Sequence, residues 1–173
     1  MFIATNPTTG EELYRYALHT KHELESALVH AEDAFAKWRK TSFEERSATL
    51  RKAADYMREH EERFATLMTE EMGKPITEAR GEVQKAIWCA EHYAEHGPTY
   101  LATVTLPSDA TLSYVQHLPL GPILGVLPWN APFWLAFRYC APAIMAGNTC
   151  LMKHDPHVPR CGEAIEEIFT QIG

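Results

Sequence analysis

The stretch Gly121–His154, GPILGVLPWNAPFWLAFRYCAPAIMAGNTCLMKH, decides the fold of this 173-residue chain. It contains a short apolar run at Ile123–Leu127, a helix-like segment from about Pro132 to Met145, and a second apolar run at Thr149–Met152. Proline suits the first turn of a helix, so Pro159 predicts a further helix that extends through Phe169. Strand, helix, strand, helix in this order predicts the beginning of a parallel, doubly wound sheet.

This sheet is expected to be incomplete. Open α/β sheets usually have about 4–6 strands, and two strands buried on both faces are too few. We therefore expect residues 121–173 to be the start of a cofactor-binding domain that is truncated at Gly173. Within it, Pro142 should end or kink its helix, because proline cannot donate the intrahelical hydrogen bond.

Four helices are predicted upstream from apolar spacing and capping signals. The segments Thr20–Glu23 and Ser42–Glu45 are capping boxes that precede the first two helices. The third should end at Gly73, and the fourth, from about Thr77 to His96, should stop at Gly97–Pro98. The expected core-facing positions are Leu24, Leu28, Ala31, Phe35, Trp38, Leu50, Ala53, Ala54, Met57, Phe64, Leu67, Met68, Ala79, Val83, Ala86, Ala90 and Tyr93.

After Pro98 the pattern becomes extended. Residues 101–106 and 111–118 alternate in polarity around the turn residues Pro107–Asp109, which predicts a β-hairpin. The expected fold is therefore α/β. An N-terminal helical layer and the hairpin occupy residues 1–120, and the first βαβα of a Rossmann-like parallel sheet occupies residues 121–173.

Composition narrows the class of protein. The chain has 16 basic and 23 acidic residues, a net charge of −7 and no basic stripe, so we expect no nucleic-acid partner. No apolar run reaches about 18 residues, and the N-terminus lacks a secretory signal, so we expect no membrane association. Four widely spaced cysteines without a CxxC pair indicate free thiols in a reducing cytoplasm.

Two candidate ligand-binding groups follow the predicted strands. Val126–Asn130 is the carboxyl end of one strand, where open parallel sheets bind their ligands. Asn130 offers an amide donor there. Lys153 follows the next strand at the equivalent edge, where its ammonium can reach the hydroxyls or phosphates of a nucleotide. Both groups are expected to point into one crevice.

Each candidate also has a simpler structural explanation. Asn130 could cap the helix that follows it, because asparagine is a favoured N-cap residue. Lys153 alone could be a solvated residue at a strand end, and Pro128 could only terminate the strand. Large aromatic residues more often pack than contact substrate, which applies to Trp129, Phe133 and Trp134.

Other charged or metal-binding patterns point to no site. His92 and His96 have the spacing of a metal-ligand pair on a helix, but no third ligand is evident, so we expect no metal. Sequence neighbours do not face each other on a helix. The pairs Glu44/Glu45, Glu61/Glu62 and Glu70/Glu71 are therefore interpreted as solvated charge.

Six motifs stand out along the chain: Asn6-Pro7-x-x-Gly10, Trp38, Met72–Pro75, Pro128-Trp129-Asn130, Ala141–Asn148 and Leu151-Met152-Lys153. Taken together, they resemble the aldehyde dehydrogenase superfamily. The resemblance covers essentially the whole chain in the family's order. The PFW continuation and the Lys-His pair look most like bacterial succinate-semialdehyde dehydrogenases.

The resemblance implies a role for each matching position. Asn130 matches the asparagine whose amide, with the backbone amide of a nucleophilic cysteine, holds the oxyanion of a thiohemiacetal. Lys153 matches the lysine that hydrogen-bonds the adenosine ribose. Pro156 stands where NAD-preferring members carry a ribose-binding glutamate, so both NAD and NADP stay open as cofactors. The wall beside the dinucleotide matches Val126, Leu127, Pro128 and Trp129.

The resemblance also implies what this chain does not contain. In the family, the nucleophilic cysteine, the glutamate base and the glycine-rich phosphate loop lie downstream of the position of Gly173. None of the four cysteines has the context of the nucleophile, and Tyr139 stands where the family often has a lysine. We therefore expect the N-terminal part of an NAD(P)-dependent aldehyde dehydrogenase that is inactive alone.

The complete enzyme would oxidise a small aldehyde, with succinate semialdehyde as the candidate, to its carboxylate. The hairpin of the family contributes to subunit assembly, which implies a homo-oligomer. The alternative is a naturally short, non-enzymatic chain that acts as an interaction module and pairs with full-length subunits.

Overall fold

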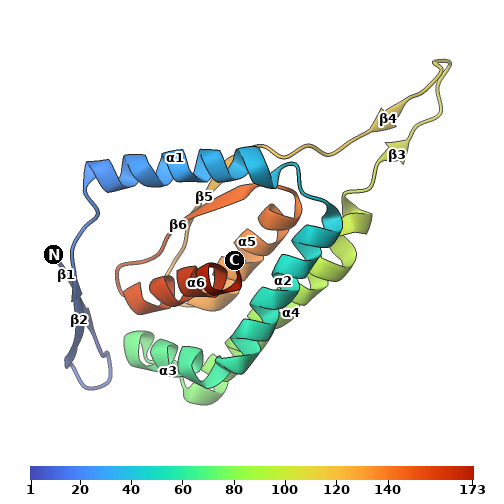
Figure 1. Cartoon of the computed structure of the whole chain (residues 1–173). Coiled ribbons are helices and arrows are strands. Elements are labelled where there is room, and N and C mark those ends of the chain that lie inside the picture. The colour runs from blue at the N-terminus through green and yellow to red at the C-terminus, as the bar shows by residue number, and fades with distance from the viewer.

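The computed structural model describes all 173 residues and confirms the predicted α/β order of elements. The helices α2 and α4 lie side by side along one flank, and α5 and α6 lie between them and the strands β5 and β6 (Figure 1). The elements are β1 (Phe2–Thr5), β2 (Glu12–Tyr16), α1 (Lys21–Trp38), α2 (Phe43–Glu59), α3 (Glu61–Met72), α4 (Ile76–Tyr100), β3 (Val104–Thr105), β4 (Tyr114–Val115), β5 (Pro122–Val126), α5 (Pro132–Met145), β6 (Thr149–Lys153) and α6 (Pro159–Ile172).

The strands β5 and β6 form the predicted parallel pair. Their register runs from Pro122 opposite Thr149 to Val126 opposite Lys153, and the sheet has these two strands only. The buried amide of Asn148 supports this pair, because its Oδ1 accepts hydrogen bonds from the backbone N–H of Leu120 (2.7 Å) and Gly121 (3.1 Å). The last residue before β6 thus holds the chain that enters β5.

One apolar core joins the helical layer to the strand-helix units. It is a cluster of 26 buried residues drawn from α2, α3, α4, α5, α6 and Val158. Its largest fully buried side chains include Phe64 on α3 and Phe133 and Phe137 on α5. The rings of Phe64 and Phe133 lie 5.0 Å apart, so the core crosses residue 120 without a break.

The expected stop of the fourth helix at Gly97–Pro98 is wrong, because α4 continues to Tyr100. Proline at position 98 deprives the carbonyl of Ala94 of its intrahelical donor. The buried hydroxyl of Ser47 on α2 supplies that donor at 2.7 Å. Gly97 is also required, since a Cβ there would lie 2.4 Å from the Met145 side chain. Likewise, Pro142 does not end α5, which runs on to Met145.

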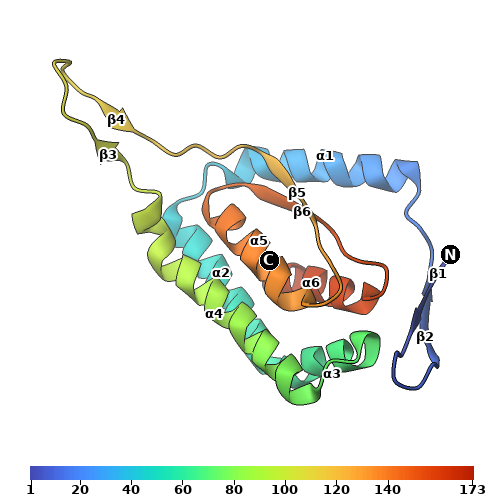
Figure 2. The same cartoon turned by 180° about the vertical axis from the view of Figure 1, so that it is seen from behind.

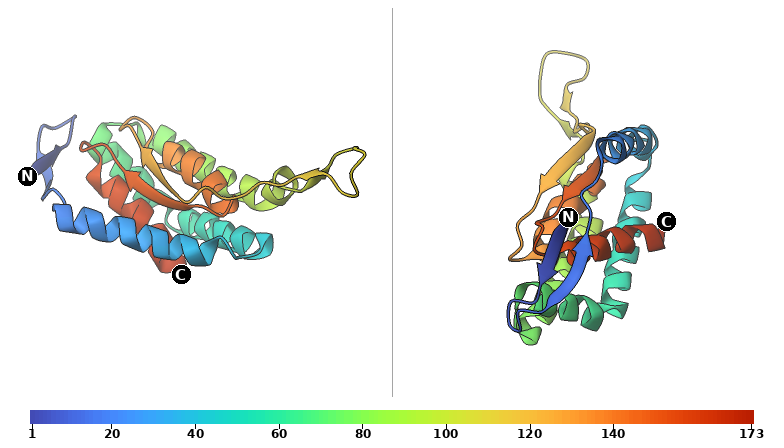
Figure 3. Two further views of the ribbon diagram at one scale, coloured as in Figure 1. Left: turned by 90° about the horizontal axis from the view of Figure 1, so that it is seen from above. Right: turned by 90° about the vertical axis from the view of Figure 1, so that its left-hand side faces the viewer.

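Two short hairpins lie at opposite ends of the molecule (Figure 2, Figure 3). The predicted hairpin exists, but its ladder is confined to β3 and β4. The hairpin of β1 and β2 was not predicted from the sequence, because each strand is short and follows no clear polarity pattern. It is anchored at Pro156, whose carbonyl accepts a hydrogen bond from the Tyr16 hydroxyl at 2.8 Å.

The apolar stripe of α1 is only partly buried. Ala31 and Phe35 are buried, but Leu24 and Leu28 are 54% and 57% exposed, so the expectation that they face the core is wrong. On the sheet, Leu124 and Val126 of β5 are also exposed. The structure therefore presents uncovered apolar side chains on α1 and β5.

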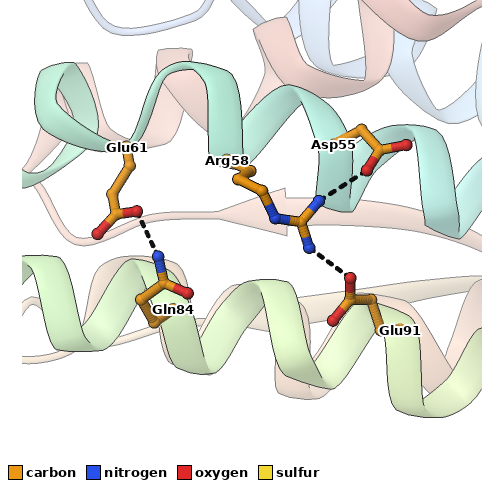
Figure 4. Close-up of polar contacts among 5 residues, drawn as sticks. All are labelled: Asp55, Arg58, Glu61, Gln84 and Glu91. Carbon is orange, nitrogen blue, oxygen red and sulfur yellow. Dashed lines mark hydrogen bonds and ion pairs between the residues drawn. The ribbon is translucent and has the colours of Figure 1, made fainter.

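The capping signals of the first three helices are confirmed. Both capping boxes are formed, and Gly73 ends α3 in the left-handed region at φ 73°. On the surface of the helical layer, Arg58 of α2 bridges Asp55 and Glu91, while Glu61 of α3 accepts from Gln84 (Figure 4). These contacts join α2 and α3 to α4. No helix is both long and apolar enough to cross a membrane.

Candidate functional site

The predicted ligand-binding residues lie at one edge of the parallel pair. Val126 is opposite Lys153 in the register, and the N–H of Leu127 donates to the Lys153 carbonyl at 3.0 Å. Pro128 and Asn130 follow as exposed residues, and Trp129 is 47% exposed. The Lys153 side chain is exposed and makes no hydrogen bond or ion pair within the chain. The structure therefore brings the two strand ends together, with their polar groups free.

The N-cap explanation for Asn130 is wrong. The N-cap residue of α5 is Ala131, and no side chain of its own segment caps this helix. The Asn130 amide is exposed and has no hydrogen-bond partner in the chain. Its conformation is held through the backbone, because its carbonyl accepts from the Lys74 ammonium at 3.0 Å.

A distant carboxylate caps α5. Oε1 of Glu82, a buried residue of α4, accepts from the backbone N–H of Phe133 (2.9 Å) and Trp134 (3.2 Å). These are free donors of the first turn, which a carboxylate stabilises further through the helix dipole. The other oxygen of Glu82 pairs with Lys74, and both side chains are largely buried, at 6% and 13% exposure.

Sequence reasoning missed this pair, although one signal was available. Glu82 lies among Ala79, Val83 and Ala86 on the apolar face of α4, where an unpaired carboxylate would be costly. A pocket of about 430 Å³ opens beside the pair. It includes no predicted site residue and is lined by Lys74, Glu78, Gly81, Glu82, Lys85, Ala131 and Trp134.

The start of α6 is built in the same way. Glu71 of α3 accepts from the backbone N–H of Arg160 (2.9 Å) and Cys161 (3.0 Å), behind Pro159 in the first turn. The interpretation of Glu71 as solvated charge is wrong, because it is 3% exposed. Burial raises the pKa of its carboxyl, although the two backbone N–H donors and Arg160 oppose that shift.

His154 is partly buried against α6, and both nitrogens of its ring are buried. Neither ring nitrogen has a hydrogen-bond partner, and desolvation lowers the pKa of the imidazole to about 4. The ring packs against Gly162, where a Cβ would lie 2.9 Å from the imidazole Cδ2. At neutral pH His154 is therefore an uncharged packing group.

The four thiols are poor nucleophiles. Burial raises the pKa of Cys89 and of Cys150 to about 11, and it raises those of Cys140 and Cys161 as well. A protonated thiol is much less reactive than a thiolate. The structural interpretation of Cys140 and Cys150 agrees with their positions, since Cys140 is buried in α5 and Cys150 is partly buried in β6.

Two further features of the sequence have structural explanations. The Tyr139 hydroxyl lies within hydrogen-bonding distance of the carbonyls of Ile123 on β5 and Leu151 on β6, 3.1 Å from the latter. It thus bridges the two strands. The rings of His92 and His96 lie 4.7 Å apart, and the Tyr100 hydroxyl is 3.1 Å from His92 Nε2. No group of three or more metal-ligating side chains occurs in the chain.

Comparison with known proteins identifies the family. The sequence profile of the aldehyde dehydrogenase family matches residues 2–173. The chain belongs to the aldehyde dehydrogenase family. Among its curated relatives, a probable succinate-semialdehyde dehydrogenase [NADP(+)] of Synechocystis sp. is 44% identical over the whole chain. A succinate semialdehyde dehydrogenase [NAD(P)+] of Escherichia coli K12 is 38% identical over 99% of the chain.

Solved structures of aldehyde dehydrogenases share the fold. The succinic semialdehyde dehydrogenase from Streptococcus pyogenes, determined with NADP+ as the cofactor, superimposes on the whole chain with a TM-score of 0.95 at 33% identity. The chain spans 38% of that protein, and 38% and 37% of the two curated relatives. It therefore corresponds to an N-terminal portion of these aldehyde dehydrogenases.

Proposed function

We propose that this chain is the N-terminal portion of an NAD(P)-dependent enzyme that oxidises an aldehyde to its carboxylate. The observation that carries the proposal is the free Asn130 amide, exposed at the carboxyl edge of the parallel pair while its backbone is anchored. Relatives whose names specify succinate semialdehyde make that aldehyde the candidate substrate. Residues 1–120 would form the helical layer and assembly hairpin, and residues 121–173 the start of the cofactor domain.

Asn130 would act as an electrostatic catalyst. When a thiolate attacks an aldehyde, the carbonyl oxygen gains negative charge, and a preorganised N–H donor lowers the energy of that state. An amide fixed through its backbone meets this charge with little reorganisation. The nucleophile would come from outside residues 1–173, because all four thiols of the chain are shifted toward the protonated form.

The residues of the strand edge fit a dinucleotide. The unpaired Lys153 ammonium would bind ribose hydroxyls, and Val126, Leu127, Pro128 and Trp129 would form the adjacent wall, with Pro156 close to the ribose. When bound along this edge, NAD(P)+ would supply the hydride acceptor that the oxidation requires. Pro156 brings no carboxylate to repel a 2′-phosphate, which is compatible with either cofactor. These residues would bind and orient the cofactor.

Assembly and location complete the proposal. The β3–β4 hairpin exposes Val104, Leu112, Tyr114 and Val115, which favours a homo-oligomer formed through this segment. Four unpaired thiols favour a cytoplasmic enzyme. The second candidate is a non-enzymatic interaction module, and the same exposed hairpin together with the uncovered β5 would serve it.

The test compares Asn130→Ala with Asn130→Asp in the full-length enzyme. Loss of one oxyanion donor should lower kcat by about 10²–10³-fold. Aspartate should be at least as harmful, because it places a negative charge where the oxyanion forms. Steady-state kinetics and melting curves would be measured for both. A near-normal kcat in Asn130→Asp would exclude the oxyanion role, and absence of any aldehyde oxidation by the full-length protein would favour the interaction module.

A further inference from the structure

The strongest unassigned feature of the chain is the buried pair Lys74–Glu82. It touches two points of one short segment. Lys74 donates to the Asn130 carbonyl at 3.0 Å, while Glu82 accepts from the amides of Phe133 and Trp134 at the start of α5. The ion pair between them closes a bridge across residues 130–134.

This bridge is well placed to control the direction of the Asn130 side chain. The amide of that side chain has no hydrogen bond of its own, and Ala131 contributes no side-chain cap to α5. Residues 130–134 are instead held from outside the parallel pair. Lys74, in the connection between α3 and α4, contacts the Asn130 carbonyl, and Glu82 on α4 contacts the amides of Phe133 and Trp134.

We propose that Lys74 and Glu82 are positioning residues that hold the Asn130 amide in the orientation needed for oxyanion binding. This inference rests on the proposed function. Lys74 acts directly on the Asn130 carbonyl, and Glu82 holds both the ammonium and the first turn of α5. A displacement of about 1 Å in a catalytic group can cost about 100-fold in rate. The pair thus contributes to turnover without touching the substrate.

Two variants separate the bridge from simple helix capping. Lys74→Met leaves Glu82 on the two amides of α5 but removes the tether to Asn130. Glu82→Gln keeps a carbonyl oxygen for both amides but turns an NH₂ group toward the ammonium. Lys74→Arg retains the charge and several N–H donors, so it should restore much of the function. Ser47→Ala is the matched control. It removes a buried hydrogen bond between α2 and Ala94 in the C-terminal part of α4, away from Glu82.

The deciding experiment is a double-mutant cycle in the full-length enzyme, assayed well below all melting temperatures. Lys74→Met should lower kcat about 10–100-fold with little change in the aldehyde KM. In an Asn130→Ala background it should lower kcat no further, because residues that act through one group are not additive. Ser47→Ala should lower the melting temperature and keep kcat. If Lys74→Met does not fold, Glu82→Gln replaces it in the cycle.

The outcomes distinguish the two proposals. A normal kcat in Asn130→Ala would overturn the oxyanion role and, with it, the positioning role. A low kcat in Asn130→Ala with either a normal kcat in the Lys74 variant, or a full further loss in the double variant, would overturn the positioning role alone.

Discussion

The β5–α5 and β6–α6 junctions start their helices with the same device and differ in one charge. Each helix has proline in its first turn. At each helix start, a buried glutamate from the helical layer accepts hydrogen bonds from two free backbone amides. At α5, Glu82 also pairs with Lys74, which reaches the carbonyl of an exposed asparagine. At α6, Glu71 has no ion-pair partner and its pKa is raised.

The difference indicates two uses of one capping arrangement. A carboxylate that is paired with a cation can stay both buried and ionised. The cation can in turn hold a polar loop that must remain open to ligand. A carboxylate without a cation holds only the helix start. We interpret the α5 junction as part of the proposed active site and the α6 junction as support for the cofactor edge.

The largest expected effect tests the extra charge directly. Glu82→Ala leaves two amides without an acceptor and the largely buried Lys74 ammonium without its counter-charge, with only the Asn130 carbonyl as partner, which should cost about 3–5 kcal/mol of unfolding free energy. Glu71→Ala leaves two amides only and should cost about 1–3 kcal/mol. Urea denaturation of both variants measures the difference, with the exposed Glu78→Ala as control. Equal losses would mean that Lys74 does not depend on Glu82, and the contrast between the junctions would disappear.

The second prediction concerns His154, which packs against Gly162 of α6. Its folded-state pKa of about 4 lies below the ordinary value of 6.5. The unfolded chain therefore binds the proton first, and stability present above about pH 6.5 is lost as the pH falls toward 4. The loss should reach roughly 3 kcal/mol.

His154→Leu should remove this dependence, because it removes the titrating ring. Melting curves between pH 8 and pH 4 would diverge from those of the unaltered chain below about pH 6.5. The control is His30→Gln, which replaces an exposed histidine of α1. Parallel curves for His154→Leu would show that the ring is solvated.

The smallest expected effect is the pH dependence of the stability that Glu71 contributes. The raised pKa of Glu71 means that the folded state keeps its proton to a higher pH than the unfolded state. Its contribution to stability is therefore greatest in acid and declines as the pH rises through and above the ordinary glutamate value. Glu71→Gln, which keeps one of the two acceptors, should differ from the unaltered chain by about 1 kcal/mol or less.

Melting temperatures at pH 4 to 7 measure this effect. The advantage of the unaltered chain over Glu71→Gln should shrink as the pH rises. An advantage that grows with pH would show that the two N–H donors outweigh burial and that the carboxylate is the stabilising form.

Much of the fold is predictable because its signals are local. The capping boxes at Thr20 and Ser42 and the left-handed Gly73 depend on residues a few positions apart. The continuation of α4 through Pro98 was not predictable in this way, because its missing donor comes from Ser47 on another helix. The exposure of Leu24 and Leu28 was missed for a related reason, since helical spacing reports an apolar face but not what covers it.

The candidate site was likewise only partly predictable from the sequence. The sequence by itself determined that Asn130 lies beyond one apolar strand and Lys153 at the end of another, and strand order alone predicts that these strand ends share an edge. It did not reveal that the start of α5 is capped from α4, or that Lys74 holds the Asn130 backbone. Those contacts join residues 51, 52 and 56 positions apart. Only the tertiary structure decides them, because a buried carboxylate finds its partners by packing and not by sequence spacing.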